Sequence, residues 1–449
     1  MSARIEVLLD EEIRAVDPSR STFRTSRFPD YPKPIGAKGF QGIAGEYIRL
    51  VEPHTEADPN YMLLYFLCLA GNVIGRGPHV VACGDQHYAN LYICAVGPTA
   101  SGRKGSATGP VERVFRLMDP NWSTRIKAGG LSSGEGLVYE VRDAIRGREK
   151  KVSNGRNSTY QDVEIDPGVA DKRLFIRQSE FYGALQNMKR TGNNLSAMLR
   201  DSWDRGELNC MTRNNPLHAS NAHISIVANI TAEELRRSLT DEIDNGFANR
   251  FLWCCSRRSK FLPSGGRLFE LDLAEFVARL SLVVDSARGD FRMCRDREAD
   301  EVWGRDNSNT GMYAELNRDR PGLFGVVTAR AAPQVLRLAL IFALLDSRDQ
   351  IGASHLFAAR EVWRYCEESA KYTFGEALEN STANEILCAL RRAQCSLTRN
   401  QILAVFHRHK SGTEIDKALH VLLTNNLAHP VPSVGSGRGR PPELWAATP

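Results

Sequence analysis

The feature that most constrains the fold is an apolar run that leads into a glycine-rich loop containing a lysine. Residues 91–96 read Leu-Tyr-Ile-Cys-Ala-Val, which predicts a buried strand, and residues 97–106 read Gly-Pro-Thr-Ala-Ser-Gly-Arg-Lys-Gly-Ser. A helical pattern follows at 106–118. A loop between a strand and a helix N-terminus can turn its backbone N–H groups inward, and the helix dipole adds positive potential there. The arrangement therefore suits phosphate oxygens.

The loop departs from the usual phosphate-binding spacing, in which the lysine follows the second glycine directly and a hydroxyl residue comes next. Arg103 stands between Gly102 and Lys104, and Ser106 lies two residues after the lysine. In such loops the lysine contacts the outer phosphates and the hydroxyl binds Mg²⁺. The alternative is an ordinary strand–turn–helix connection that is rich in small residues.

A second strand is predicted to end in polar residues. Residues 174–180 read Leu-Phe-Ile-Arg-Gln-Ser-Glu, and Glu180 is the only carboxylate among them. A nucleotide-hydrolysing site needs a carboxylate near such a strand end, to orient Mg²⁺ or the attacking water. Gln178 stands where a second acidic group would be useful, but an amide takes neither a proton nor a full negative charge. The alternative is a surface polar pair.

Other polar residues are candidates for contact with a nucleotide. Asn229 ends the apolar run 223–229, although it could also cap a following helix. Arg250 begins the strand at 250–255 and could reach a nucleotide across a subunit interface, or form an ordinary ion pair. Arg330 and Arg337 lie on an apolar helix at 329–346, where a solvated or ion-paired face is the alternative for Arg337.

The order of predicted elements indicates an α/β protein with a parallel sheet covered on both faces. Strands at 173–177, 223–229 and 250–255 alternate with helices, a helix is expected within 131–147, and 148–171 is expected to be an exposed polar loop. Helices at 382–393, 398–408 and 413–426, followed by a basic hairpin-like tail, suggest a winged helix. We expect five parts: an N-terminal arm (1–37), a helical segment packed on the core (38–90), a nucleotide-binding core (91–260), a helical lid (261–378) and the winged-helix domain (379–449).

Composition adds weaker constraints. The chain has 449 residues and a net charge of +5, which permits nucleic-acid binding without requiring it. Ten cysteines without a C-x-x-C pair favour buried free thiols in a reducing compartment. The N-terminus has early acidic residues and no long apolar segment, so we expect no signal peptide. The longest apolar stretches, such as 335–345, look too short to span a bilayer, and a cytoplasmic protein is expected.

Several segments together resemble one family of P-loop ATPases. The segments are GIAGEYIRLVEPHTEADP, NVIGRGPHV, VGPTASGRKGS, SEF followed by MLRDSWDRGEL, HISIVANIT, NGFANRFLW and ARAAPQVLRLALIFALLD. The family occurs in plasmids, phages and actinobacterial elements, often fused or adjacent to primase–polymerase domains. It is similar to hexameric replicative helicases of the RecA/AAA+ class. The resemblance covers residues 38–378.

The resemblance implies roles for individual residues. The family's loop also reads G-R-K-G-S/T, which implies that Lys104 binds phosphate, that Ser106 binds Mg²⁺ and that Glu180 is the acidic strand end. It implies Glu at the position of Gln178, so that hydrolysis is slowed here, and a nucleotide contact by the lid arginine Arg330. The expected nucleotide-binding residues are Gly97, Thr99, Ala100, Ser101, Gly102, Arg103, Lys104, Gly105, Ser106 and Arg330; the expected catalytic residues are Glu180, Gln178, Asn229 and Arg250.

Basic residues are candidates for nucleic-acid binding in two places. In ring motors the loops between the acidic strand and the next strand face the central channel, where basic side chains track a phosphate backbone. Here that stretch contains Lys189, Arg190, Arg200, Arg205 and Arg213, and the C-terminal tail contains Arg438 and Arg440 after His407, Arg408, His409 and Lys410. The alternatives are a solvated basic loop and a winged helix that binds protein.

The function expected from these features is that of an ATP- and Mg²⁺-dependent motor on nucleic acid. The most specific version is a hexameric DNA helicase that replicates a mobile element or phage, with Arg250 acting on the neighbouring subunit's nucleotide. The alternative is a nucleotide-gated assembly on DNA, such as an origin binder, a loader or a defence ATPase, with little unwinding; Gln178 favours it. No membrane contact is expected.

Overall fold

A five-stranded parallel sheet forms the centre of the protein. The computed structural model describes residues 31–98, 105–152, 158–211, 216–238, 245–304, 310–320, 322–375, 381–393, 395–406, 409–424, 427–431 and 443–448. The strands are β3 (Tyr92–Val96), β4 (Ile126–Ala128), β7 (Arg173–Gln178), β10 (His223–Ile230) and β11 (Phe251–Cys255), in the spatial order β11-β3-β10-β7-β4. The parallel sheet predicted from the alternating pattern is confirmed.

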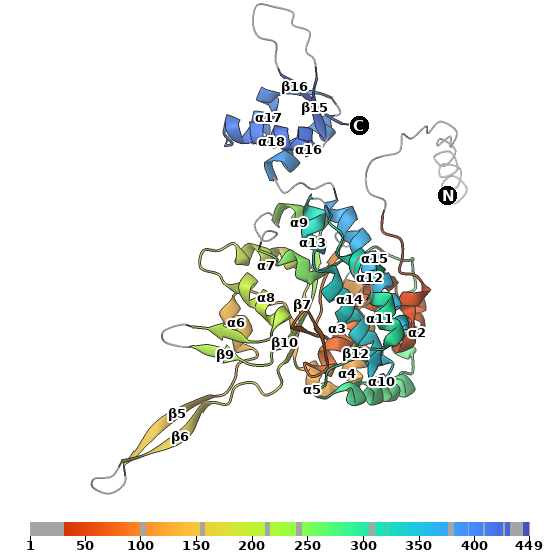
Figure 1. Ribbon diagram of the computed structural model, residues 1–449, viewed down its shortest axis with the longest axis vertical. Helices are drawn as coiled ribbons and strands as arrows, with labels where there is room; N and C mark the ends of the chain where they lie inside the picture. The colour runs from red at the N-terminus through yellow and green to blue at the C-terminus, as the bar shows by residue number, and fades with distance from the viewer. Residues whose placement is uncertain are drawn as a thin grey trace, which may run out of the picture.

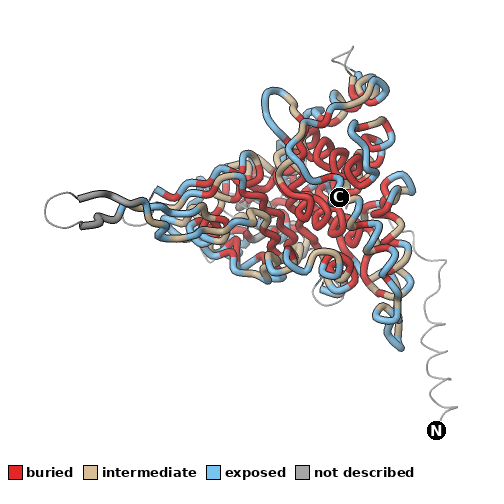
Figure 2. Tube along the Cα trace, turned by 90° about the horizontal axis from the view of Figure 1, so that it is seen from below, coloured by how far each residue is buried: buried red, intermediate tan, exposed pale blue. Residues whose placement is uncertain are grey.

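Both faces of the sheet are buried, which explains why its strands read as continuous apolar runs. On β3, Ile93 and Ala95 pack into one hydrophobic core, whereas Tyr92, Cys94 and Val96 pack into a second core. Successive side chains of a strand point to opposite faces, so the two cores cover the two sides of one sheet. Buried residues fill the middle of the molecule in Figure 2.

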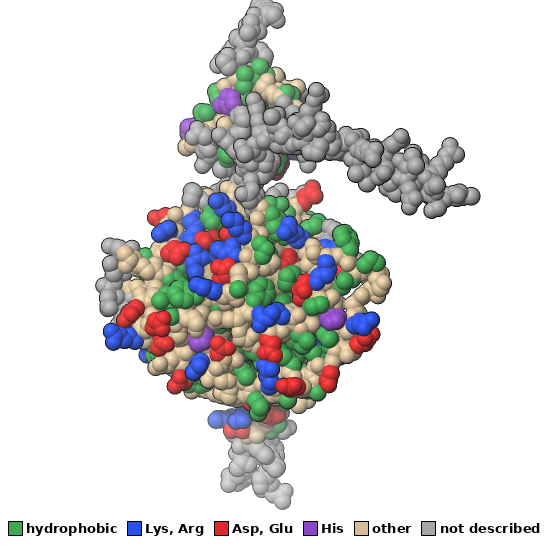
Figure 3. Space-filling view, turned by 90° about the vertical axis from the view of Figure 1, so that its right-hand side faces the viewer, with side chains coloured by type: hydrophobic (Ala, Val, Ile, Leu, Met, Phe, Trp, Pro, Cys, Tyr) green, Lys and Arg blue, Asp and Glu red, His purple; other side chains and the backbone are tan. Residues whose placement is uncertain are grey.

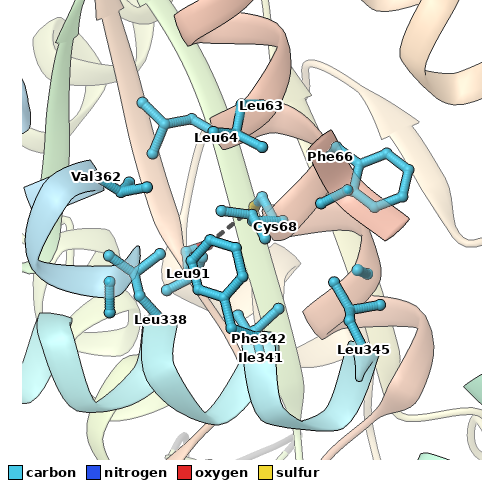
Figure 4. Close-up of a cluster of buried hydrophobic side chains, with 14 of the residues drawn as sticks. Leu63, Leu64, Phe66, Cys68, Leu91, Leu338, Ile341, Phe342, Leu345 and Val362 are labelled. Atoms are coloured by element: carbon cyan, nitrogen blue, oxygen red, sulfur yellow. Dashed lines mark hydrogen bonds between the residues drawn. The ribbon is translucent and has the colours of Figure 1, made fainter. Parts of the chain in front are cut away.

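Helices from distant parts of the chain cover the first face. They are α2 (Gly42–Val51), α3 (Pro59–Ile74), α4 (Thr108–Met118), α10 (Ala274–Ala287) and α14 (Ala331–Leu345). Helix α3 begins because Asp58 accepts a hydrogen bond from the Asn60 N–H, and it ends at Gly75, whose φ of 99° suits only glycine. Figure 4 shows α3 and α14 packing through Phe66, Leu338 and Phe342. The segments predicted to be an N-terminal helical segment and a lid therefore share one core with the sheet.

The second face is covered by α6 (Gly134–Tyr139), α7 (Phe181–Met188), α8 (Leu195–Asp204), α9 (Ala232–Ser238) and α13 (Gly322–Thr328). The hairpin β1 (His79–Ala82) and β2 (Asp85–Tyr88) precedes the sheet, and short helices α5 (Pro120–Ser123), α11 (Arg297–Trp303) and α12 (Gly311–Leu316) lie between the larger elements.

A long helix closes one edge of the sheet. Helix α15 (Ala353–Phe374) runs along β11, where the Ser369 hydroxyl accepts a hydrogen bond from the Cys255 N–H at 3.1 Å and Tyr365 donates to the Cys255 carbonyl. Side chains thus satisfy the backbone groups at the end of this edge strand. The ribbon of α15 beside the central sheet is visible in Figure 1.

A two-stranded arm projects from the core where the sequence suggested a loop. The helix predicted within 131–147 is present as α6, but β5 (Ile145–Val152) pairs with β6 (Ser158–Asp166), so the loop predicted at 148–171 is wrong (Figure 1). The pairing joins opposite charges across the strands, as between Arg148 and Asp162, and Arg142 anchors the base through Asp166 at 2.6 Å. Such cross-strand partners are not local in sequence, which hid the arm.

One apolar stretch is longer than the sequence suggested. Gly322–Leu345 is long and apolar enough to cross a membrane by length and composition, but 78% of its apolar window is buried inside the molecule. Burial of this kind is typical of the core helix of a soluble protein, and the segment supplies α13 and α14. The expectation that every apolar stretch is too short is wrong for this segment, yet the packing is consistent with a soluble protein.

The C-terminal residues form a small unit with its own core. Its elements are α16 (Ser381–Ala393), β14 (Leu397–Thr398), α17 (Arg399–Val405), α18 (Gly412–Thr424), β15 (Ala428–Val431) and β16 (Leu444–Ala447). The strands are antiparallel in the order β14-β16-β15, and Ile386, Ile402, Leu419 and Trp445 share one hydrophobic cluster. Three helices and a terminal hairpin are present as predicted.

Candidate functional site

The path of the chain diverges at the carboxyl end of β3. From β3 the chain crosses to β4 through α4 on the first face, whereas from the neighbouring β10 it crosses to β11 through α9 on the second face. In open α/β sheets ligands bind in the crevice that such a divergence leaves outside the carboxyl ends of the strands. The glycine-rich loop that begins at Gly97 starts at this crevice.

The first residue of the loop is held by both neighbouring strands. The Gly97 N–H donates to the Ile230 carbonyl of β10 at 3.3 Å, and the Ser256 N–H after β11 donates to the Val96 carbonyl at 2.9 Å. A Cβ at residue 97 would lie 2.3 Å from the Ser256 carbonyl oxygen, so only glycine fits. A Cβ at Gly105 would meet nothing within 4 Å.

Much of the predicted loop lies outside the described residues. These are Thr99, Ala100, Ser101, Gly102, Arg103 and Lys104, together with the side chain of Ser106. The chain is described again from Gly105, in a single 3-10 turn (Gly105–Ala107) that leads into α4. The predicted sequence of strand, loop and helix is therefore present.

Gln178 ends β7 and is buried, with 9% of its surface exposed. Its Nε2 donates to the Glu180 carbonyl at 2.9 Å, and its Oε1 has no hydrogen-bond partner among the described residues. In register Gln178 lies beside Ala228 of β10, next to Asn229. Two strand spacings separate β7 from β3, and Gln178 is in register with Cys94, three residues before Gly97, so Gln178 lies about 14 Å from the start of the loop.

Glu180 follows β7 directly and is exposed. Its carboxylate and the free Oε1 of Gln178 supply oxygen ligands at the carboxyl edge of the sheet, and oxygen is the donor that Mg²⁺ prefers. Among the described residues no group of three or more His, Cys, Asp or Glu side chains could hold a metal ion.

Asn229 lies near the carboxyl end of β10, beside β3. It pairs in register with Ala95 of β3, is 8% exposed, and its Oδ1 accepts a hydrogen bond from the Tyr61 hydroxyl at 2.9 Å. Burial raises the pKa of Tyr61 well above its usual value, so this phenol stays neutral and remains a donor. Helix α3 thus fixes the side chain of Asn229 from the first face.

A buried carboxylate on α4 was missed by the sequence reasoning. Glu112 is 3% exposed; it accepts from Tyr65 of α3 at 2.6 Å and forms an ion pair with Arg177 of β7 at 2.7 Å. Burial opposes the charge of Arg177, but Glu112 outweighs it and raises the pKa of that guanidinium. The only sequence signals are an Arg in an apolar strand and the i,i+4 pair of Glu112 with Arg116. The ion pair between Glu112 and Arg177 connects α4 to β7, the strand that carries Gln178.

The two predicted nucleotide-contacting arginines meet one carboxylate at the opposite edge. Arg250 Nη2 lies 2.5 Å from Asp204 Oδ2, and Arg330 Nη1 lies 3.1 Å from Asp204 Oδ1. Arg250 immediately precedes β11, so the cluster sits at the amino ends of the strands, about 20 Å from the start of the loop along β3. Within one chain the structure does not bring these arginines to Gly97, where the glycine-rich loop begins.

Arg337 completes this cluster and is fully buried. Its guanidinium stacks on Trp203 at 3.6 Å and donates to the Asn90 Oδ1 at 2.6 Å and to the Trp203 carbonyl at 2.8 Å. Burial lowers the pKa of Arg337 to about 9, which keeps it charged at neutral pH. The solvated face weighed for Arg337 is wrong; its side chain is a buried link from α14 to α8 and to Asn90, which precedes β3.

The predicted nucleic-acid residues are dispersed. Lys189 and Arg190 are exposed after α7, whereas Arg205 is exposed beyond the far end of α8, a ten-residue helix about 15 Å long. Arg200 is half-buried and donates to the Asn245 carbonyl at 2.8 Å. Arg213, His407, Arg408, Arg438 and Arg440 lie outside the described residues. On the face shown in Figure 3, Lys and Arg side chains are mostly interspersed with Asp and Glu.

Comparison with known proteins adds no relative. Neither a scan against protein-family models nor a search of curated proteins returned a match. The site is therefore interpreted from its own geometry and from the resemblance of its motifs.

Proposed function

We propose that this chain is an ATP-binding and ATP-hydrolysing oligomeric motor that acts on nucleic acid, with a P-loop NTPase core. The observation that carries the proposal is the position of the glycine- and lysine-containing loop. It begins at the carboxyl ends of β3 and β10, where the connections of the sheet diverge, and its first glycine admits no side chain. Phosphate binding at this position follows from the general rule for open α/β sheets.

In this proposal the residues divide the work. Lys104 supplies positive charge to the outer phosphates, the Ser106 hydroxyl and Glu180 provide oxygen ligands for Mg²⁺, and Asn229 is fixed beside the γ-phosphate position. Mg²⁺, when bound, neutralises the charge of the transferred phosphoryl group. Arg250 or Arg330 would act on the neighbouring subunit's nucleotide, in a hexameric ring.

The C-terminal unit supports a role on DNA. Its element order of helix, strand, two helices and two hairpin strands matches a winged helix, with Arg438 and Arg440 in the segment that joins the hairpin strands. Lys189 and Arg190 would contact one strand in the ring channel. The best description is a replicative DNA helicase of a mobile element or phage, working in the cytoplasm.

The test measures ATP affinity, ATP turnover with and without single-stranded DNA, and particle shape with ATP and Mg²⁺. We expect binding in the wild type, loss of binding in Lys104→Ala, and no change in Lys371→Ala, an exposed lysine on α15. Rings that form with nucleotide support the trans-arginine arrangement. A persistent monomer, or turnover that DNA does not stimulate, contradicts the motor.

A second candidate is a nucleotide-gated DNA-binding assembly with little unwinding. It follows if the amide at residue 178 acts as a disabled base, because slow hydrolysis would keep the ATP-bound form on DNA for longer. Unwinding assays separate the two candidates: ATP-dependent DNA binding without strand separation supports the nucleotide-gated assembly.

A further inference from the structure

The amide of Gln178 has a fixed orientation. Its Nε2 donates to the Glu180 carbonyl at 2.9 Å. The opposite orientation would place Oε1 against that carbonyl oxygen, and two acceptors repel each other. The hydrogen bond therefore determines which end of the amide faces the rest of the site.

The other end of the amide is an acceptor with no donor. Oε1 is buried, and no group in the described part of the chain donates to it. A Cβ at Gly129 would lie 3.8 Å from Oε1, so this oxygen lies over the glycine turn that follows β4, at the carboxyl edge of the sheet. A buried acceptor left without a donor costs about 1–3 kcal/mol, which makes this oxygen a position for an incoming donor.

We propose that Gln178 works as an amide: Oε1 accepts a hydrogen bond from the attacking water and orients it toward the γ-phosphate. This inference rests on the proposed ATPase function. The water oxygen forms a bond to the γ-phosphorus as the bond to the ADP oxygen breaks, and ADP keeps that electron pair. The water's proton passes to the phosphate product or to solvent, because Gln178 takes none. Glutamine is known to orient water in this way in other nucleotide hydrolases.

The surroundings fit an amide better than a carboxylate. A Glu at residue 178 would place a second acceptor against the Glu180 carbonyl, at the separation that the amide now bridges with a hydrogen bond. Repulsion and burial would then favour the protonated acid and raise its pKa. A protonated acid donates to the carbonyl and cannot act as a base, so restoring the charge would not restore a catalyst.

Turnover separates an orienting amide from a disabled base. For Gln178→Leu we expect a loss of turnover of about tenfold or more with an ATP Kd within about threefold of wild type, and for Gln178→Glu no gain at pH 7. Gln86 is an exposed amide on β2, so Gln86→Leu is the matched control and should change neither turnover nor the ATP Kd. A gain of about tenfold in Gln178→Glu, or full turnover in Gln178→Leu, overturns the inference.

Unfolding gives a readout that needs no nucleotide. If the folded state raises the pKa of the introduced acid, it holds a proton that the unfolded state releases, so the stability of Gln178→Glu falls relative to wild type as pH rises from about 4 to about 8. A pH-independent difference between the two proteins in urea unfolding contradicts the fit to an amide. Wild-type protein that binds no ATP would instead overturn the proposed function and remove the water-orienting role, whereas the unfolding result would still report on the geometry.

Discussion

Asp204 neutralises Arg250 at the amino edge of the sheet, 46 residues away in sequence, through an N–O contact of 2.5 Å. The Arg250 side chain is 7% exposed, and its Nη1 also donates to the Gly246 carbonyl. Arg330 shares the same carboxylate but is 33% exposed. Of the two arginines, Arg330 is therefore the more available to a neighbouring subunit, whereas Arg250 first supports the fold.

Substitution of the two arginines should separate these roles. Arg250→Ala leaves the Gly246 carbonyl without this donor and Asp204 with Arg330 as its remaining ion-pair partner, so we expect a loss of up to about 3 kcal/mol in the free energy of unfolding. Arg330→Ala should cost less than about 1 kcal/mol and should lower DNA-stimulated turnover while ATP still binds. Urea unfolding and turnover assays on both variants measure this; equal destabilisation would contradict the ranking.

Gly97 and Gly105 make a matched pair in the loop. Gly97→Ala forces a methyl group against the Ser256 carbonyl, where the ideal distance is 2.3 Å, and should destabilise the protein by about 1–3 kcal/mol and weaken ATP binding. Gly105→Ala meets no atom within 4 Å and should leave stability unchanged or slightly raised. Thermal unfolding and nucleotide titration of the two variants test the pair. Unchanged stability and ATP affinity in Gly97→Ala would show that Gly97 and the Ser256 carbonyl can move apart.

The ion pair between Glu112 and Arg177 should be costly to break. Glu112→Gln keeps an acceptor for Tyr65 but leaves Arg177 with an uncompensated charge, so we expect a loss of about 3 kcal/mol. Glu301→Gln removes an exposed i,i+4 pair with Arg297, in which the glutamate is 57% exposed, and should cost less than about 0.5 kcal/mol. Chemical denaturation of both variants measures the loss in the free energy of unfolding. Similar losses would mean that the buried pair stabilises the fold no more than the exposed pair does.

Acid should destabilise the protein through His87. Burial, with Arg337 nearby, lowers the pKa of His87 from 6.5 to about 4. Between these values the unfolded chain binds a proton that the folded chain does not, so stability falls as pH falls, by up to about 3 kcal/mol at pH 4. His87→Gln should reduce this slope in urea titrations at several pH values. An unchanged slope would assign the acid sensitivity to other groups, such as the buried His223, whose pKa burial lowers to about 3.

The sequence predicted elements whose signal is local. The strands that became β3, β7, β10 and β11 are short apolar runs, and the helices that became α4 and α14 follow a helical pattern, so each was found within a few residues. The arm was missed because Arg148 and Asp162 stabilise each other across two strands, and a Glu- and Lys-rich run suits a helix or loop equally well.

The site was predictable only in part, for the same reason. Gln178 and Asn229 stand at the ends of predicted parallel strands, so their place at the carboxyl edge of the sheet follows from topology. Asp204, the partner of Arg250, lies 46 residues away, and Arg177, the partner of Glu112, lies 65 residues away. No local sequence pattern predicts these contacts. Residues that act through such distant partners can be recognised only in the folded structure.

The cover that α15 places on β11 has a consequence for assembly. Because Ser369 and Tyr365 occupy the backbone groups of Cys255, a second molecule cannot extend the sheet there by adding a strand, which is the usual route to fibrous aggregates. On this side, neighbouring subunits would have to meet through side chains, which can part and rejoin as ligands come and go. In the proposed motor, subunit contacts would change in every cycle, and contacts made by side chains rather than by a shared sheet would allow this.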